Sequence, residues 1–407
     1  MTRRVPRKNA PFRYPHQIGV GTVEITPLGR RYIADVLRSA RLSYGPFSRA
    51  FERKFARLHA RRFAVFCNSG TSALQIAVDA LRERCGWKRG DEVLVPAATF
   101  IASANVILMA GLTPVFVDID PLYYDIDPAQ IDRHITRRTR AIMPVHLFGQ
   151  PCDMAPILEI VRRRRLQMIE DSCEAMFVKY RGAPVGSWGQ IACFSTYAAH
   201  LITTGVGGLA CTNDEDLAIL LKSLCNHGRD GVYTSIDDGQ RLRGARMRRV
   251  VERRFAFIRR GYSFRATELE AALGLAHLAT WKKMIAARQR NAEYLTERLR
   301  PLEDFIQLPR VRPRTEHAFM MYPIIVRPGR ARKRDLVFFL EQRNVETRDA
   351  FPLLSQPFYR RLFGPIASRY PVAQWVTQNG LYIGCHPGLG RNELDFIIEQ
   401  IHAFFKR

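Results

Sequence analysis

Short apolar runs bounded by turn residues alternate with amphipathic segments along the first half of the chain. Helical spacing of apolar residues marks the segments 48–62, 72–85, 101–110 and 153–165. The β-branched or aromatic runs expected to form strands are residues 63–67, 92–97, 113–118, 141–146, 167–171, 191–195 and 207–212. Because this alternation builds parallel sheets with crossover helices, it predicts an α/β fold with a mostly parallel seven-stranded sheet between helices.

The second half of the pattern predicts a smaller domain. Helical spacing runs over 266–300 and stops before Pro301, and a strand-like run follows at 320–326. We therefore predict an N-terminal arm and large domain over 1–265, a long connecting helix over 266–300, and a small α+β domain over 301–407. The Arg-rich stretch 230–262 has no clean period. It is either a solvated insertion or a loop over an active site that meets an anionic ligand.

Composition is that of a globular enzyme. The chain has 407 residues, of which 47% are hydrophobic and 25% charged, enough for a large core and a second domain. No apolar run approaches the roughly 20 residues that cross a bilayer, and the basic N-terminus has no signal-peptide segment behind it. A cytoplasmic location without membrane attachment is expected. The eight cysteines are scattered without a CxxC pair, which favours reduced thiols over disulfides or a metal site.

The formal charge of +25 raises the question of nucleic-acid binding. The 63 basic residues include only nine lysines and are spread along the whole chain. No helix-turn-helix, zinc or RNA-binding signature accompanies them. The sequence therefore favours a protein without a nucleic-acid partner.

Three segments concentrate residues suited to chemistry. Hydroxyls and backbone N–H groups of residues 67–74 follow a predicted strand and open a helix, so they form either a phosphate site or only the N-cap of that helix. Asp171 ends another strand, and its carboxylate is either a functional group at the sheet edge where α/β folds bind ligands or a solvated strand end. Residues 194–208 combine hydroxyls, His200 and a glycine-rich turn between two strands.

In this order, these segments resemble the DegT family of nucleotide-sugar aminotransferases, which has the aspartate-aminotransferase fold, fold type I of pyridoxal phosphate enzymes. The resemblance covers nearly the whole chain. It is carried by YGPFSRAFERKFARLHA, SGTSAL, GDEVLVPAATFIASANVI, PVFVDID, PVHLFGQPCDM, IEDSCEA, the FSxxxxH segment, NHGRD and GYSFRATELEAALGLA.

The resemblance implies roles for matching positions. Asp171 would pair with the pyridine nitrogen of the cofactor, and Phe100 would stack on its ring. Ser263 matches a position that reaches the cofactor phosphate from the neighbouring subunit, usually as Asn, which implies a homodimer. The other implied cofactor-binding residues are Gly70, Thr71, Ser72, Glu174 and Ser195.

His200 occupies the place of the family's Schiff-base lysine. An imidazole lacks a primary amine and forms no stable imine with pyridoxal phosphate. The resemblance therefore implies a cofactor that is held non-covalently, as pyridoxamine phosphate. Histidine still transfers protons near neutral pH, so His200 is the expected catalytic residue.

This replacement resembles the family's sugar 3-dehydratases, which act on nucleotide-linked 4-keto-6-deoxyhexoses. The sequence SCE after Asp171 and the C-terminal NGLYIGCHPGL resemble the same branch. One dehydratase mechanism uses an iron–sulfur cluster, but residues 231–235 read GVYTS where its cysteines would stand, so no cluster is expected. The other regenerates pyridoxamine phosphate with glutamate. Val206 and Leu201 depart from the Glu and second His found in many relatives.

A diphosphate-linked substrate also calls for cations, and Arg229, Arg265 and Arg348 stand in matching or neighbouring segments. The leading hypothesis is a 3-dehydratase. The alternatives are an aminotransferase-like enzyme without a covalent anchor, and a degenerate homologue that only binds a sugar nucleotide.

Overall fold

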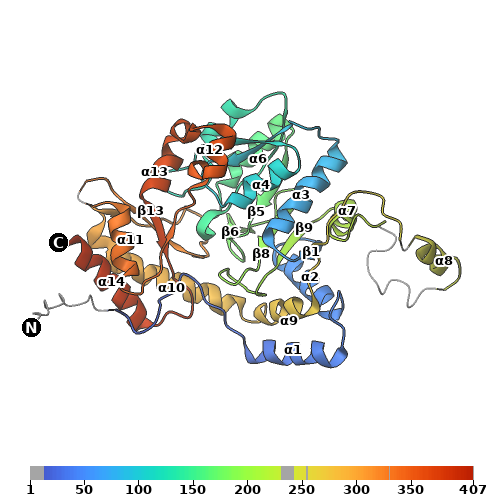
Figure 1. Cartoon of the computed structure of the whole chain (residues 1–407), viewed down its shortest axis with the longest axis horizontal. Helices are drawn as coiled ribbons and strands as arrows, with labels where there is room; N and C mark the ends of the chain where they lie inside the picture. Colours follow the sequence, from blue (N-terminus) through green and yellow to red (C-terminus); the bar gives the residue numbers. More distant parts are fainter. Residues whose placement is uncertain (1–12, 231–242, 254, 330, 407) are drawn as a thin grey trace, which may run out of the picture.

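The large domain is built on one seven-stranded sheet (Figure 1). The computed structural model describes residues 13–230, 243–253, 255–329 and 331–406. In spatial order the strands are β1 (Phe63–Cys67), β9 (Gly208–Thr212), β8 (Ile191–Ser195), β5 (Gln167–Asp171), β4 (Thr139–Ile142), β2 (Glu92–Pro96) and β3 (Thr113–Val117). All pairings from β8 to β3 are parallel, and β9 is antiparallel to both of its neighbours. The predicted α/β fold and its mostly parallel sheet are confirmed.

Helices cover the sheet and connect its strands. α3 lies at the centre and is buried throughout residues 72–78, because it packs on β1, β8 and β9 and also on α4 and α7. The helices of the large domain and the connection are α1 (Pro27–Ser39), α2 (Pro46–Leu58), α3 (Gly70–Cys85), α4 (Ile101–Met109), α5 (Pro128–Ile131), α6 (Met154–Arg164), α7 (Glu215–Cys225), α8 (Gly244–Arg253), α9 (Glu268–His277) and α10 (Trp281–Leu299).

α10 leads into a second, four-stranded antiparallel sheet with the order β10-β11-β13-β12 (Figure 1). Its own apolar cluster joins this sheet to α10, α11 and α14. The elements of this part are β10 (Ile306–Gln307), β11 (Tyr322–Val326), α11 (Lys333–Glu341), β12 (Arg348–Asp349), α12 (Pro357–Phe363), α13 (Pro371–Asn379), β13 (Gly380–Ile383) and α14 (Arg391–Phe405). A separate two-stranded ribbon consists of β6 (Lys179–Tyr180) and β7 (Ala183–Pro184).

Two expected helices differ from prediction. The long connecting helix over 266–300 is two helices. After α9 ends at His277, the Ala279 and Thr280 backbone N–H groups donate three residues back instead of four, and Thr280 has the non-helical backbone angles φ −118° and ψ 1°. The helix expected over 48–62 ends at Leu58, because His59 leaves the helical conformation and Ala60 has a φ of 53°. Within the described residues, no helix has the length and apolarity needed to cross a bilayer.

The topology gathers polar residues at one edge of the sheet. Asp171 and Ser195 end the neighbouring parallel strands β5 and β8, and α3 begins three residues after β1. Because the carboxyl ends of parallel strands meet at one edge, these residues surround a common crevice.

Candidate active site

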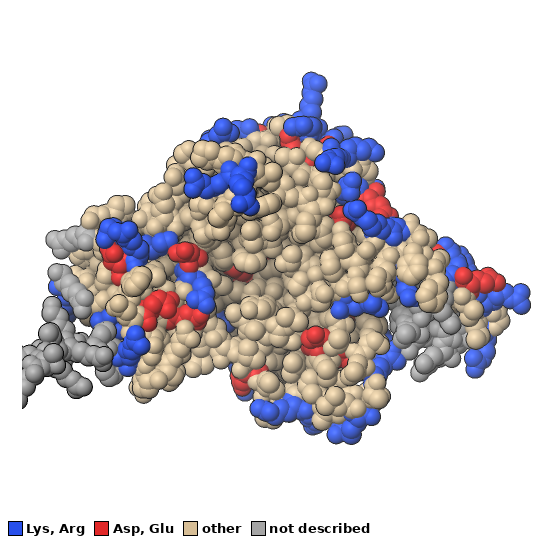
Figure 2. All heavy atoms as spheres, viewed as in Figure 1, with Lys and Arg blue, Asp and Glu red and all other residues tan. Residues whose placement is uncertain are grey.

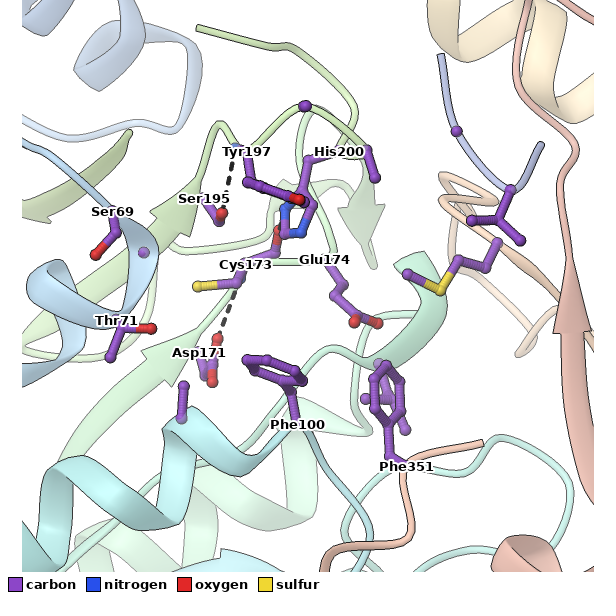
Figure 3. Close-up of a pocket in the computed structure, with 18 of the residues that line it drawn as sticks. Ser69, Thr71, Phe100, Asp171, Cys173, Glu174, Ser195, Tyr197, His200 and Phe351 are labelled. Carbon is purple, nitrogen blue, oxygen red and sulfur yellow. Dashed lines mark hydrogen bonds between the residues drawn. The ribbon is translucent and has the colours of Figure 1, made fainter. Parts of the chain in front are cut away.

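A cavity of about 610 Å³ opens at this edge between the large sheet and the C-terminal part of the chain. Figure 3 shows Ser69 and Thr71 on one side, Phe351 on the other, and Asp171, Cys173 and His200 between them. The predicted residues that line the cavity are Gly70, Thr71, Phe100, Asp171, Glu174, Ser195, His200 and Arg348. The sequence therefore identified residues from five separate segments that the fold brings together.

The N-terminus of α3 forms one end of the cavity. The Ser69 side chain caps the helix by accepting from the Ser72 backbone N–H at 3.0 Å, and Thr71 is exposed to the cavity. A Cβ on Gly70 would lie 2.7 Å from the Ser195 Cβ, so only glycine allows the helix start to approach β8 this closely. The Ser72 hydroxyl instead donates to Asn68 at 2.7 Å and is buried behind the lining. The free helix N–H groups favour a phosphate here.

Asp171 forms the floor of the cavity. It is 3% exposed, accepts from the Ser103 hydroxyl at 2.7 Å and from the Cys173 backbone N–H at 3.2 Å. Burial raises the pKa of this carboxyl, and the hydrogen bond from Ser103 works against that rise. A buried carboxylate with neutral donors gains most from a cationic partner, such as a protonated ring nitrogen. Phe100 presents a half-exposed aromatic ring beside it.

His200 lies on the opposite side of the cavity. Its Nδ1 is 2.8 Å from the Cys173 carbonyl oxygen. Because a carbonyl only accepts, Nδ1 carries the proton and Nε2 keeps its lone pair. Burial lowers the pKa of His200 to about 4, so the ring is neutral at pH 7. His200 is therefore arranged as a base.

Glu174 adds a second buried acid. Its Oε2 accepts from the Phe148 backbone N–H at 2.7 Å. Burial raises the pKa of Glu174 to about 8, and the nearby Asp171 carboxylate adds to the rise. The side chain is therefore a neutral carboxylic acid at pH 7 and can donate a hydrogen bond into the cavity.

Of the three predicted arginines, only Arg348 lies at the cavity. Arg348 lines the cavity and pairs with Glu346. The Arg229 guanidinium lies over Phe255 and Phe257, outside the cavity lining. Arg265 contacts His227 and Ser263 at 3.2 Å each, also outside the lining. Residues 231–235, where the cysteines of an iron–sulfur cluster would stand, lie outside the described residues.

Sequence reasoning missed several lining residues. A segment before α1, residues 20–23, crosses the cavity, and its Val20 N–H donates to Glu346 at 2.8 Å. The paired glycines of Gly19-Val20-Gly21 were the only sequence signal for this close passage. Other lining residues for which the sequence predicted no individual role include Ser69, Cys173, Tyr197, Met321, Glu346, Phe351 and Tyr382.

Fold and site together define a fold type I enzyme of the pyridoxal phosphate class. The model of the DegT/DnrJ/EryC1/StrS aminotransferase family matches residues 25–402, and the chain belongs to this family. The GDP-perosamine synthase of Caulobacter vibrioides is 36% identical over 388 residues, covering 95% of this chain and 97% of that protein.

Dehydratases are also among the relatives. A dTDP-4-dehydro-2,6-dideoxy-D-glucose 3-dehydratase of Saccharopolyspora spinosa is 32% identical over 403 residues, covering 94% of this chain and 87% of that protein. The E coli GDP-4-keto-6-deoxy-D-mannose-3-dehydratase with bound hydrated PLP superposes with a TM-score of 0.86 at 25% identity, covering 95% of this chain and 100% of that chain. The chain is thus a nucleotide-sugar-modifying enzyme of the DegT family that depends on pyridoxal phosphate chemistry.

The cavity fits the family's cofactor, pyridoxal phosphate or pyridoxamine phosphate. The α3 N-terminus with Thr71 and Ser195 would hold the phosphate, because these residues line the cavity and a helix N-terminus favours an anion. Asp171 would hold the ring nitrogen, and Phe100 would cover the ring face. These residues come from different strand and helix ends, and together they provide an anion site, a buried negative charge and a flat apolar surface.

Proposed function

We propose that the chain removes the hydroxyl at carbon 3 of a nucleotide-linked 4-keto-6-deoxyhexose, with pyridoxamine phosphate as cofactor, in deoxysugar or polysaccharide biosynthesis. One observation carries this proposal. His200 faces the cavity as a neutral base, and none of the described residues that line the cavity is a lysine. An enzyme without a lysine there has no covalent resting state, and this favours the dehydratase branch over the aminotransferases that the family is named for.

The protein's residues supply binding and proton transfer. Pyridoxamine phosphate, when bound, supplies a primary amine for the keto carbon and a conjugated ring that accepts electrons. Asp171 would keep the ring nitrogen protonated from its buried position. Nε2 of His200 would accept a proton inside the cavity and release it again, since the Cys173 carbonyl holds the opposite nitrogen protonated. Glu174 would donate a hydrogen bond as a neutral acid.

The proposed substrate class and amino donor are inferred from similar proteins. The Caulobacter vibrioides and Saccharopolyspora spinosa proteins are named for GDP- and dTDP-linked sugars, respectively. A nucleotide sugar is therefore the proposed substrate here, and glutamate is the proposed donor that restores the amine. The proposed assembly is a homodimer in which Ser263 reaches the cofactor phosphate of the neighbouring subunit. Its place outside the cavity of its own chain is compatible with such a role.

A second candidate is an aminotransferase-like reaction without a covalent anchor. It is favoured by the 36% identity to a perosamine synthase, against 32% to the 3-dehydratase. In that case the amine of the cofactor would pass to the sugar, and no oxygen would leave carbon 3. The two candidates share the same cavity and differ in their products.

Mass spectrometry of the product separates these possibilities. The purified protein is incubated with pyridoxal phosphate, glutamate and GDP-, CDP- or dTDP-linked 4-keto-6-deoxyhexoses. The proposal expects a product that has lost the carbon 3 oxygen, whereas a product that has gained an amino group would support the aminotransferase. An absorption titration with each B6 form runs in parallel. If neither form binds, a homologue that only binds sugar nucleotides becomes the better account.

A further inference from the structure

Two buried carboxylates stand next to each other at the end of β5, and their surroundings differ. Glu170 lies outside the cavity lining and forms an ion pair with Arg61 at 3.3 Å. Asp171 lines the cavity and accepts from the Ser103 hydroxyl at 2.7 Å and from the Cys173 backbone N–H at 3.2 Å. The charge of Glu170 is therefore balanced inside the protein, whereas that of Asp171 is held by neutral donors and left for a ligand.

The hydrogen bond between Ser103 and Asp171 has one direction. An ionised carboxylate accepts and cannot donate, so the Ser103 hydroxyl gives its proton to Asp171. The Thr99 hydroxyl lies 3.0 Å from the same Ser103 oxygen. Because the Ser103 proton is already used, Thr99 is the donor in this second bond. The three side chains thus form a directed chain from Thr99 through Ser103 to Asp171.

Both hydroxyls belong to the start of α4, which also carries Phe100. Phe100 is the N-cap of α4, and its carbonyl accepts from the Ser103 backbone N–H at 3.2 Å. Thr99 and Ser103 are each 1% exposed, and both line the cavity. Figure 3 shows the Phe100 ring beside the Asp171 carboxylate. One helix start therefore fixes both the aromatic ring and the donor to the carboxylate.

The cavity lining offers Asp171 little positive charge. Arg348 is the only lysine or arginine among the described lining residues, and it pairs with Glu346. Figure 2 shows lysine and arginine side chains spread over the outer surface of the molecule. A hydrogen bond to the charged form of a carboxylate stabilises that form, and a donor that itself accepts a hydrogen bond donates more strongly. The charge of Asp171 therefore depends on Ser103, and through Ser103 on Thr99.

We propose that Ser103, supported by Thr99, is a positioning residue that keeps Asp171 ionised and directed at the ring nitrogen of the bound cofactor. This inference rests on the proposed pairing of Asp171 with that nitrogen. Since Ser103 stabilises the carboxylate, the proton shared by Asp171 and the ring lies nearer the ring nitrogen than it would beside a carboxylate without this donor. A protonated ring accepts electrons better. The two hydroxyls thus set how strongly the cofactor withdraws electrons.

The first test observes the ring nitrogen and needs no turnover. Wild type and Ser103→Ala are loaded with pyridoxamine phosphate that is isotopically labelled at the ring nitrogen, and the nitrogen NMR resonance is measured. We expect a protonated ring in the wild type. In Ser103→Ala the resonance should move toward that of the unprotonated cofactor, because a carboxylate that loses a donor holds the proton more tightly. The same resonance in both proteins would overturn the proposal, and so would an unprotonated ring in the wild type.

Three further variants separate this role from a structural one. Ser172→Ala is the matched control, because it removes a buried hydroxyl next to Asp171 that has no hydrogen-bond partner among the described residues. Its resonance should equal that of the wild type, as should that of Ser103→Thr, which keeps a hydroxyl. Thr99→Val removes only the second donor and should give a smaller change in the same direction. If Ser103→Ala does not fold, an unchanged resonance in Thr99→Val refutes the proposal.

Turnover gives an independent readout. With the nucleotide-sugar substrate, Ser103→Ala should lower kcat by at least about tenfold, the usual value of one hydrogen bond to a charged group, and leave the KM of the sugar near that of the wild type. Ser103→Thr should recover the rate. A lower kcat without a change at the ring nitrogen would contradict the proposed role. If the wild type shows no turnover, the dehydratase proposal fails, and the NMR comparison still decides this one.

Discussion

Cys173 links the two groups on which the chemistry depends. Its carbonyl oxygen accepts from Nδ1 of His200 at 2.8 Å, and its backbone N–H donates to the Asp171 carboxylate at 3.2 Å. One backbone residue therefore sets the tautomer of the base and supports the buried negative charge of the floor. The distance between base and carboxylate is held by main chain instead of flexible side chains.

Replacing His200 with alanine should abolish proton transfer and spare cofactor binding. We expect turnover to fall by about 10²–10⁴-fold, the usual contribution of a positioned acid–base group. Asp171, Thr71 and Ser195 remain in place, so the absorption titration with pyridoxamine phosphate should match that of the wild type. Added imidazole should restore part of the rate by entering the vacated space. An unchanged rate in the variant would remove His200 from the mechanism.

Glu174→Gln tests whether the buried carboxyl is neutral. Because its pKa is raised to about 8, the folded wild type holds a proton that the unfolded chain releases above about pH 4.5. The wild type should therefore lose stability relative to the variant as the pH rises from about 4.5 to 8, by up to about 1.4 kcal/mol per pH unit. Urea unfolding at several pH values measures this difference. A stability difference that does not change with pH would mean that Glu174 is ionised in the folded protein.

Gly21→Ala tests the segment that crosses the cavity. A Cβ at this position would lie 2.9 Å from the Ala199 Cα, so the loop that carries His200 must shift. We expect a stability loss of about 1–3 kcal/mol, as for other overpacked sites, and a lower turnover. Thr22→Ala, which removes atoms from the same segment, is the matched control. Thermal unfolding and steady-state rates that equal those of the wild type would show that the loop tolerates displacement.

The burial of His59 should make the folded protein less stable in acid. Burial among Phe55, Phe177 and Phe194 lowers the pKa of His59 to about 4. The unfolded chain takes up a proton below about pH 6.5, while the folded chain does so only near pH 4. The stability that the neutral, buried His59 contributes is fully present above pH 6.5 and is lost as the pH falls toward 4. Relative to His59→Phe, the wild type should therefore weaken over this range, by up to about 1.4 kcal/mol per pH unit. A difference in unfolding free energy between the wild type and His59→Phe that stays constant at all pH values would contradict the prediction.

The sequence was most informative where local pattern and chemistry coincide. β5 and β8 have the predicted bounds, because apolar runs ended by polar residues define buried parallel strands. Asp171 and His200 were recognised from the motifs around them, and the fold places both at one cavity.

What the sequence did not reveal depends on long-range packing. The bond from His200 to the Cys173 carbonyl joins residues 27 positions apart and has no side-chain signal, because the acceptor is main chain. Phe351 lines the cavity from the C-terminal part of the chain, and its φ is 40°. No local sequence pattern predicts this backbone conformation. The break between α9 and α10 was missed because residues 266–300 favour helix throughout. The local sequence pattern predicts helices and strands, whereas the geometry of the site depends on how elements far apart in the sequence pack together.

The absence of a covalent anchor for the cofactor is the central claim and can be measured directly. The wild type is saturated with pyridoxal phosphate, reduced with borohydride, digested and mapped by peptide mass, with His200→Lys as the positive control. The account predicts that none of the nine lysines of the wild type carries the cofactor. In the control, the substituted position should be labelled. A stoichiometric lysyl–cofactor adduct in the wild type would contradict the role of His200.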